Sequence, residues 1–237
     1  MSELLNNAFY ESVFFGLVLT LSAYWFGSFM QRKFKYTFVN PLLIASVIII
    51  VVLVAFGISY DTYVYGAKYI SFLLTPATVC LAVPMYKQLL ILKKNIIAVF
   101  AGILCGVVAG VFSILLLSLM LNVSPEIYAS LLPKSITTAI AIGVSEEIGG
   151  NTAITVCSVV ITGVFGAVVS KAVCRLFKIT EPVAVGLAMG NSAHAIGTSK
   201  AIEIGEVEGA MSSLSIVVAG IITVVVANLM VQFDVLF

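Results

Sequence analysis

The sequence contains few charged residues. Lysine, arginine, aspartate and glutamate make up 10% of its 237 residues, whereas an ordinary globular domain contains about 25%. The net charge is only +1, and there is no basic tract with interleaved aromatic residues of the kind that binds nucleic acid. Hydrophobic residues make up 61% of the chain, with a mean hydropathy of +1.18. This composition excludes an ordinary soluble domain and a nucleic-acid partner, and it predicts a protein that lies in a lipid bilayer.

Several further patterns are missing. No apolar run shows the period-two alternation of a membrane β-barrel strand, and several runs reach the roughly 20 residues that a membrane-spanning helix needs. The 4 cysteines lack C-x-x-C spacing, so we expect no metal site and no disulfide. Motifs such as H-E-x-x-H and G-x-S-x-G are absent. We therefore expect an all-α polytopic membrane protein with about 6–8 membrane segments, which is not an enzyme and has no cofactor.

The apolar runs predict six ordinary spans. The residues before the first run, up to Asn7, lack a basic segment, so this run is expected to be a retained helix rather than a cleaved signal. A turn is expected at residues 58–66. Pro76 and Pro84 lie inside the third run, and because proline interrupts the helical hydrogen bonds, a kink or break is predicted at residues 75–78. The predicted spans are 13–30, 41–57, 67–86, 96–121, 152–174 and 211–232.

The basic residues predict the orientation of these spans. Loops rich in lysine and arginine stay in the cytoplasm, and most of the basic residues fall into three groups. These groups are Arg32, Lys33 and Lys35; Lys87, Lys93 and Lys94; and Lys171, Arg175 and Lys178. If all three are inside, the N-terminus is outside, and both ends of the segment 127–151 are outside. That segment is therefore predicted to be re-entrant, or a pair of short helices, rather than one crossing.

A second polar segment, 186–209, begins on the predicted inner side. It holds the single histidine of the chain. If it is also re-entrant, the two polar segments enter from opposite faces and meet at the midplane, as in transporters built from inverted repeats. A poor but ordinary spanning helix is the alternative. We expect one domain over residues 1–237, with possible repeat halves 1–121 and 122–237.

Both polar segments predict a cavity, because non-helical backbone inside a membrane must face protein or water. On a continuous helix Asn191, His194 and Thr198 would share one face. Hydroxyl groups and amides beside the N-terminus of a half-helix suit a small organic carboxylate, and a nearby lysine would supply charge. The predicted binding residues are Lys134, Ser135, Thr137, Thr138, Asn191, Ser192, His194, Thr198 and Lys200. The predicted structural or hinge residues are Pro76, Pro84, Pro133, Gly149, Gly150, Gly190 and Gly197. Candidate coupling or gating residues are Glu146, Glu147 and Glu203.

Each of these features has a structural alternative. His194 is either a packing residue bonded to a carbonyl group or a functional group that can carry a coupling proton. Lys134 and Lys200 are alternatively residues near helix ends whose charges reach the membrane surface. The glycines also suit close helix packing. A solvated interface is the alternative for Glu146, Glu147, Glu206 and Glu208.

Two long motifs carry a family resemblance. The segments L-P-K-S-I-T-T-A-I-A-I-G-V-S-E-E-I-G-G at 132–150 and G-L-A-M-G-N-S-A-H-A-I-G-T-S-K-A-I-E-I-G-E-V-E-G-A at 186–210 closely resemble the LrgB/CidB family. T-P-A-T-V-C-L-A-V-P-M-Y-K at 75–87 fits as well. The chain departs from the family pattern at three places. Relatives often have proline at the position of Ala139 and an apolar residue at the position of Asn151. They also often have threonine followed by alanine at the positions of Asn191 and Ser192.

The resemblance implies two functions. Bacterial members of the family are described as antiholin-like proteins that restrain murein hydrolases and autolysis, usually beside a holin-like LrgA/CidA membrane partner. Plant relatives exchange small 2-hydroxy acids, and bacterial relatives are linked to pyruvate movement. We expect a homo-oligomeric transporter of small monocarboxylates such as pyruvate, glycolate or glycerate in the bacterial inner membrane. A non-transporting antiholin-like regulator is the alternative.

Overall fold

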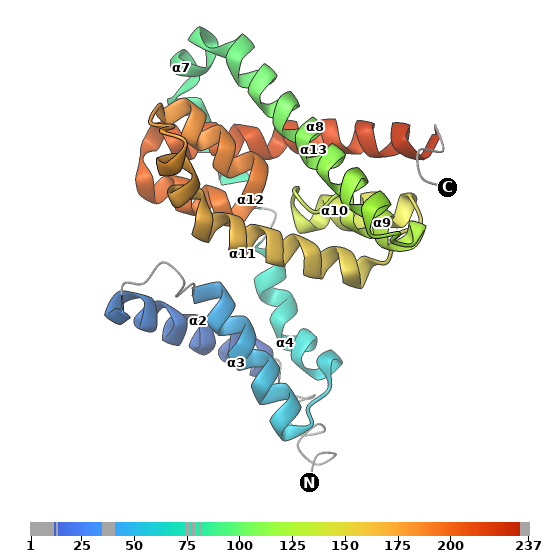
Figure 1. The fold of residues 1–237 in the computed structure, drawn as a ribbon. Coiled ribbons are helices and arrows are strands. Elements are labelled where there is room, and N and C mark those ends of the chain that lie inside the picture. Colours follow the sequence, from blue (N-terminus) through green and yellow to red (C-terminus); the bar gives the residue numbers. More distant parts are fainter. Residues whose placement is uncertain are drawn as a thin grey trace. The chain divides into compact units, whose positions relative to one another are not determined.

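The computed structural model describes residues 12, 14–34, 41–73, 76, 79–80 and 82–232. Every regular element among them is a helix (Figure 1). The chain divides into two compact units, residues 1–80 and residues 81–237. The all-helical architecture predicted from the composition is therefore confirmed, and each unit is described in turn.

The helices of the first unit whose bounds the structure describes are α2 (Phe15–Phe34), α3 (Pro41–Phe56) and α4 (Tyr60–Phe72). Helix α2 approaches the other two helices closely through glycines. A Cβ atom added at Gly16 would lie 2.1 Å from the Tyr63 carbonyl oxygen, and one added at Gly27 would lie 2.6 Å from that of Pro41. The hydroxyl groups of Thr20 and Tyr63 are hydrogen-bonded at 2.8 Å. Small residues thus allow the backbones of this unit to pack directly against each other.

The predicted turn at 58–66 is wrong, because α4 already begins at Tyr60. The polar residues form the start of the helix: the Ser59 hydroxyl group accepts a hydrogen bond of 3.2 Å from the Thr62 backbone amide. Asp61 lies in the first turn, where a negative charge is favoured by the helix dipole. The next helix with described bounds is α6, which begins at Ala82. The break predicted at 75–78 lies outside the described residues apart from Pro76. The side chain of Pro84 is also outside them.

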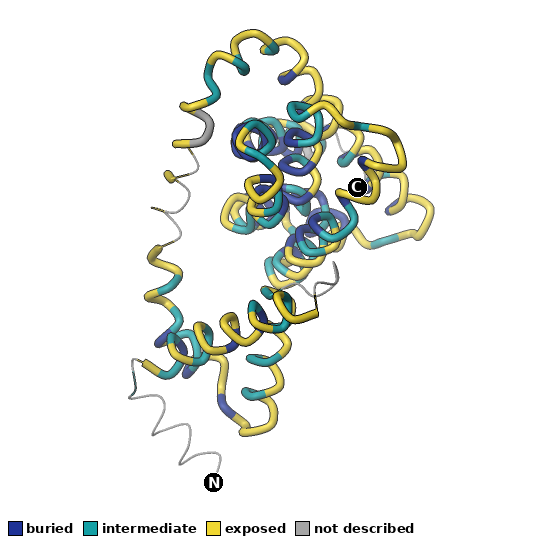
Figure 2. Tube along the Cα trace, turned by 90° about the vertical axis from the view of Figure 1, so that its left-hand side faces the viewer, coloured by how far each residue is buried: buried dark blue, intermediate teal, exposed yellow. Residues whose placement is uncertain are grey.

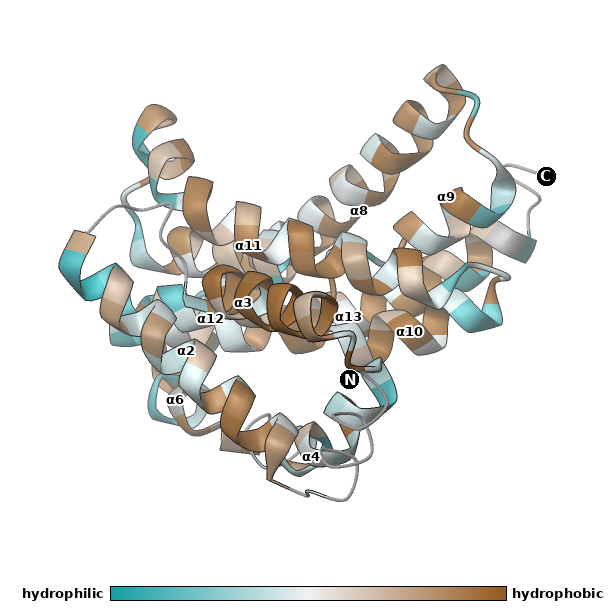
Figure 3. Ribbon diagram, turned by 90° about the horizontal axis from the view of Figure 1, so that it is seen from below, coloured by the Kyte–Doolittle hydropathy of each residue, from teal (hydrophilic) through white to brown (hydrophobic). Residues whose placement is uncertain are grey.

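The second unit contains the three long apolar helices. Among the described residues, α8, α11 and α13 are long and apolar enough to cross a membrane, whereas α3 is apolar but shorter. The hydrophobic residues along these helices are brown in Figure 3. The spans predicted at 96–121, 152–174 and 211–232 correspond to them. In chain order the helices of this unit are α6 (Ala82–Lys87), α7 (Leu89–Lys94), α8 (Ile96–Met120), α9 (Pro125–Leu131), α10 (Thr138–Glu147), α11 (Thr152–Leu176), α12 (Pro182–Ile204) and α13 (Glu206–Gln232).

Helix α13 is the central helix of the second unit. Inside this unit 61% of its apolar stretch is buried, compared with 28% for α8 and for α11, and buried positions are dark blue in Figure 2. Its N-terminal half packs against α12 without intervening side chains. A Cβ atom at Gly186 would lie 2.4 Å from the Glu208 carbonyl oxygen, and one at Gly190 would lie 2.4 Å from that of Ser212. The two glycines therefore permit backbone contact between α12 and α13.

Candidate functional site

The first predicted polar segment folds into a helical hairpin made of α9, a connection at 132–137, and α10. The Ser130 hydroxyl group of α9 accepts a bond of 2.7 Å from the Asn151 backbone amide. The Thr155 hydroxyl group of α11 bonds to the Ser145 hydroxyl group of α10 at 2.6 Å and to the Ser130 carbonyl oxygen at 3.0 Å. Both arms of this first hairpin are thus attached to the start of α11, which confirms the prediction of a pair of short helices.

A tight turn returns the chain from the first hairpin to α11. Gly149 has φ +79°, and the Gly150 amide donates 2.7 Å to the Ser145 carbonyl oxygen. This is the Schellman arrangement, in which a residue with positive φ ends a helix. A Cβ atom at Gly150 would lie 2.7 Å from the Ser130 backbone nitrogen. The structural role predicted for these two glycines therefore has two causes: Gly149 has a positive φ, and Gly150 has no space for a side chain.

The second polar segment also reverses direction, although it is nominally the single helix α12. His194 has φ 40° and ψ −132°, a conformation that non-glycine residues rarely adopt. A Cβ atom at Gly197 would lie 2.4 Å from the Met189 carbonyl oxygen. Eight residues of a straight helix rise about 12 Å, so this contact requires the chain to fold back. Residues 182–193 and 195–204 therefore form the first and second arms of a second hairpin.

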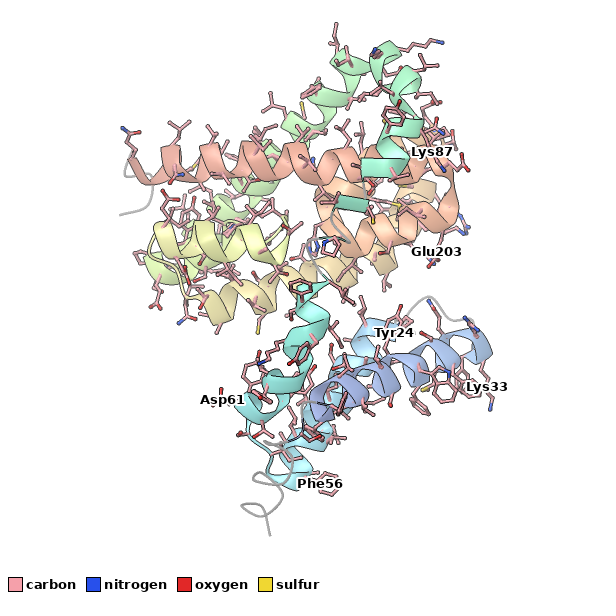
Figure 4. The ribbon with its side chains drawn as sticks, turned by 180° about the vertical axis from the view of Figure 1, so that it is seen from behind. Tyr24, Lys33, Phe56, Asp61, Lys87 and Glu203 are labelled. Atoms are coloured by element: carbon pink, nitrogen blue, oxygen red, sulfur yellow. The ribbon has the colours of Figure 1, made fainter. Side chains whose placement is uncertain are left out.

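The two hairpins enter the second unit from opposite ends. Asn95 before α8 and Glu181 before α12 line the same cavity, and Gly186 packs on Glu208 at the start of α13. Four chain positions therefore lie together: the start of α8, the end of α11 and the two ends of the second hairpin. We call this end of the unit the Lys93 end, after a residue in the last turn of α7. Figures 1 and 4 show α12 and the pair α9–α10 at opposite ends of α13.

The other end, which we call the Glu126 end, holds both ends of the first hairpin. The Asn151 side-chain amide donates 3.4 Å to the Glu126 carboxylate, and the Tyr128 hydroxyl group donates 3.6 Å to the sulfur of Met230 near the end of α13. A 25-residue helix followed by a hairpin thus occurs twice, in opposite directions, at 96–147 and 152–204. The opposed entry predicted from the charges is confirmed within this unit, while the repeat halves 1–121 and 122–237 stay a prediction.

The tips of the two hairpins meet in a cavity of about 650 Å³. Lys134 and Ser135 line it from the first hairpin, and Asn191 and Ser192 line it from the second. Gly106 and Gly110 of α8 also line this cavity, and they lie near the centre of that 25-residue helix. A recess that also contains Ser135 and Asn191 reaches Thr223 of α13. The polar tips therefore lie about midway along helices that are long enough to cross a membrane.

Lys134 is the cationic group of this cavity. Its ammonium group donates 3.1 Å to the Ser135 hydroxyl oxygen. The ion pair found among the described residues joins Lys200 to Glu203 instead, so Lys134 has no carboxylate partner there. Glu181 lines the same cavity beside Asn95, at its Lys93 end. The site thus offers an uncompensated positive charge and a hydroxyl donor at mid-depth.

Several predicted binding residues do not line this cavity. The face predicted from Asn191, His194 and Thr198 does not form, because the helix is interrupted at His194. The buried His194 ring bonds through Nε2 to the Val159 carbonyl oxygen at 3.0 Å. The Thr198 hydroxyl group bonds to the His194 carbonyl oxygen at 3.0 Å and to the Ser212 hydroxyl group at 2.7 Å. Both residues hold the turn in place, and their direct contact with a ligand stays a prediction.

The remaining predicted residues occupy the tips or the ends. Thr137 is the residue before α10 and Thr138 is its first residue, so both lie at the tip of the first hairpin, where Pro133 is fully buried. Lys200 and Glu203 are partly exposed and paired with each other on the second arm. Glu146 and Glu147 lie in the last turn of α10, at the Glu126 end. A role of these acidic residues in coupling or gating is untested.

Two glycines that the sequence interpretation missed make room for tip residues. A Cβ atom at Gly106 would lie 1.9 Å from the Asn191 Nδ2 atom, and one at Gly163 would lie 2.5 Å from the His194 ring. The spacing of Gly102, Gly106 and Gly110 places them on one face of α8, which is a signal of close helix contact. Gly163 lies four residues before Ala167 on α11, which is the same spacing of small residues, but this spacing does not show that the facing residue is His194.

Long apolar helices combined with two opposed polar hairpins define a polytopic helical membrane protein. The model of the LrgB-like family matches residues 20–233, and the chain belongs to this family. It is 37% identical over 215 residues to the holin-like protein CidB of Staphylococcus aureus strain Mu50, covering 91% of this chain and 94% of the relative. It is 39% identical over 222 residues to the antiholin-like protein LrgB of Bacillus subtilis, covering 93% and 96%. No solved structure matches.

Proposed function

We propose that the protein is a secondary transporter of small organic monocarboxylates, with the anion bound between the two hairpin tips. The observation that supports this proposal is the meeting of the tips in one cavity that contains Lys134. Broken helices that enter from opposite faces and meet at mid-depth are the arrangement in which many transporters bind their substrates. A purely structural bundle gains nothing from polar, interrupted helices at this depth.

The charge of the site favours a monoanion. A lysine near the centre of a bilayer costs at least about 2.5–3.5 kcal/mol on insertion scales, and an anion beside Lys134 offsets this cost. The N-terminus of α10 at Thr138 lies at one tip, and the second arm of α12 begins at the other. Helix N-termini carry a partial positive charge, which adds to the attraction. One ammonium group matches one carboxylate, as in pyruvate, glycolate or glycerate.

Uptake of labelled carboxylates into proteoliposomes tests this function. Replacing Lys134 by methionine keeps a long unbranched side chain and removes the charge, so we expect at least a tenfold loss of uptake, equivalent to about 1.4 kcal/mol. Lys171→Met is the matched control, because Lys171 is exposed on α11 and does not line the cavity. Absence of carboxylate uptake by the native protein, or full uptake by Lys134→Met, contradicts the proposal.

The proposal includes an orientation in the bacterial cytoplasmic membrane. Lys93 and Lys94 in the last turn of α7 and Arg175 in the last turn of α11 lie at the Lys93 end, and loops rich in basic residues remain cytoplasmic. The Lys93 end is then cytoplasmic and the Glu126 end external. An external N-terminus and a homo-oligomeric assembly belong to the same proposal.

A second candidate function rests on the names of the relatives, "antiholin-like" and "holin-like". In that case the protein restrains murein hydrolases and autolysis through a holin-like LrgA/CidA partner. The apolar outer surfaces of α8 and α11 would contact the partner, and the cavity would be dispensable. Lysis assays in cells that lack the native gene separate the two: Lys134→Met should then restore lysis control, and substitutions on those outer surfaces should not.

A further inference from the structure

The side chain of Asn191 has a fixed orientation in the cavity. Its Nδ2 atom donates 3.0 Å to the Ile103 carbonyl oxygen of α8. A carbonyl oxygen only accepts hydrogen bonds, so the amide nitrogen must face Ile103 and the Oδ1 atom must face away from it. Gly106 makes this arrangement possible, because a Cβ atom there would lie 1.9 Å from Nδ2. The structure of α8 therefore decides which atom of Asn191 is left for a ligand.

The atom left for a ligand is a hydrogen-bond acceptor. Among the described residues, the Asn191 side chain bonds to Ile103 through Nδ2, and Oδ1 has no partner. Asn191 lines the cavity together with Lys134 and Ser135. An amide oxygen accepts hydrogen bonds and cannot donate them. A ligand is therefore favoured if it presents an O–H group to Asn191.

The groups on the first hairpin have the opposite character. The Lys134 ammonium group uses one of its N–H bonds on Ser135 and keeps the others for a ligand. Because the Ser135 oxygen accepts this bond, its hydroxyl hydrogen remains available to donate. The tip of the first hairpin thus suits the carboxylate of a ligand, and Asn191 on the second hairpin suits a donor next to that carboxylate.

We infer that Asn191 recognises the hydroxyl group of 2-hydroxy acids and thereby selects them over 2-oxo acids of the same carbon skeleton. The inference rests on the proposed function and narrows its substrate class. A 2-hydroxy acid donates its O–H to Oδ1 while its carboxylate contacts Lys134 and Ser135. A 2-oxo acid places a carbonyl oxygen against Oδ1, so two acceptors face each other and neither is satisfied. Sites built to bind a substrate hydroxyl group discriminate strongly against analogues that lack it.

Lactate and pyruvate test this inference, because they differ only at the 2-position. Uptake into proteoliposomes should show a kcat/KM for lactate at least tenfold above that for pyruvate. Asn191→Ala should bring the ratio close to one. Gly106→Ala should lower the ratio with Asn191 still present, because the new Cβ displaces the amide. Gly143→Ala is the control and should leave the ratio unchanged, since this glycine of α10 does not line the cavity and a Cβ atom there would contact nothing within 4 Å.

The ratio is measured within each variant, so a smaller amount of folded protein cancels out. A native protein that takes up pyruvate as efficiently as lactate overturns the inference, and so does an unchanged ratio in Asn191→Ala. In both cases the proposed function stands, because carboxylates are still transported. Uptake of neither acid, together with no heat of binding for either in calorimetry, overturns the proposed function and the inference with it.

Discussion

Replacing Gly163 by alanine should destabilise the second hairpin through the His194 ring. The new Cβ atom would lie 2.5 Å from Cε1 and 2.7 Å from Nε2 of His194, the nitrogen that bonds to the Val159 carbonyl oxygen at 3.0 Å. Overpacking of this kind costs about 1–3 kcal/mol, and loss of the hydrogen bond adds about 1 kcal/mol. We expect the free energy of unfolding to fall by about 2–4 kcal/mol.

The same substitution should cost much less when the ring is absent. His194→Gly removes the clash and relieves a backbone conformation whose strain is about 1–3 kcal/mol for a non-glycine residue. The next contact of the new Cβ atom is the Ile196 Cδ1 atom at 2.9 Å, which is the movable end of a side chain. In the His194→Gly background the cost of Gly163→Ala should therefore fall below about 1 kcal/mol.

Thermal unfolding of the four proteins in detergent completes this double-mutant cycle. For a chain of this length, 1 kcal/mol corresponds to a shift in Tm of about 2–4 °C, so Gly163→Ala alone should lower Tm by at least about 4 °C. Additive effects of the two substitutions would refute the reasoning, because they would mean that the ring and Gly163 do not contact each other in the folded protein.

Two further predictions concern the first hairpin and the orientation of the second unit. Thr155→Val should lower the free energy of unfolding by about 1–3 kcal/mol, because it leaves the buried Ser145 hydroxyl group without its partner. The control is Cys157→Ser, because Cys157 is exposed on the same helix. This substitution should change the free energy of unfolding by no more than about 0.5 kcal/mol. In a protein without other cysteines, single cysteines at Lys94 and Arg175 should react with an impermeant reagent from the same side of the membrane. Labelling from opposite sides would contradict the arrangement of the hairpins.

The long helices were predictable because their signals are local. The run predicted at 96–121 corresponds to α8 at Ile96–Met120. The run at 152–174 corresponds to α11. The Asn151 side chain caps the start of this helix by accepting hydrogen bonds from the backbone amides of Ala153 and Ile154. The re-entrant character of both polar segments followed from counting charges on each side. The length of an apolar run, its capping residues and its flanking charges can all be recognised in the sequence without knowing which helices pack against each other.

The details of the site were less predictable because they depend on tertiary contacts. The regular spacing of Asn191, His194 and Thr198 predicted one helical face, but the helix breaks at His194 itself. The predicted hinge residues Gly190 and Gly197 lie on either side of this break, and their positions alone did not locate it. The turn is held by the Val159 carbonyl oxygen on α11, which no local pattern reveals. The polar segment was also predicted to continue to residue 209, whereas α13 already begins at Glu206, with Glu206 and Glu208 in its first turn.

The hydrogen bonds between the second hairpin and α13 have a consequence for the synthesis of the protein. Thr198 bonds to Ser212 at 2.7 Å, and the Ser215 hydroxyl group donates 3.2 Å to the Leu187 carbonyl oxygen. The ribosome makes the hairpin first, so its polar tip reaches the membrane before the helix that supports it has been translated. Stable insertion of this segment is therefore decided by residues that leave the ribosome after it.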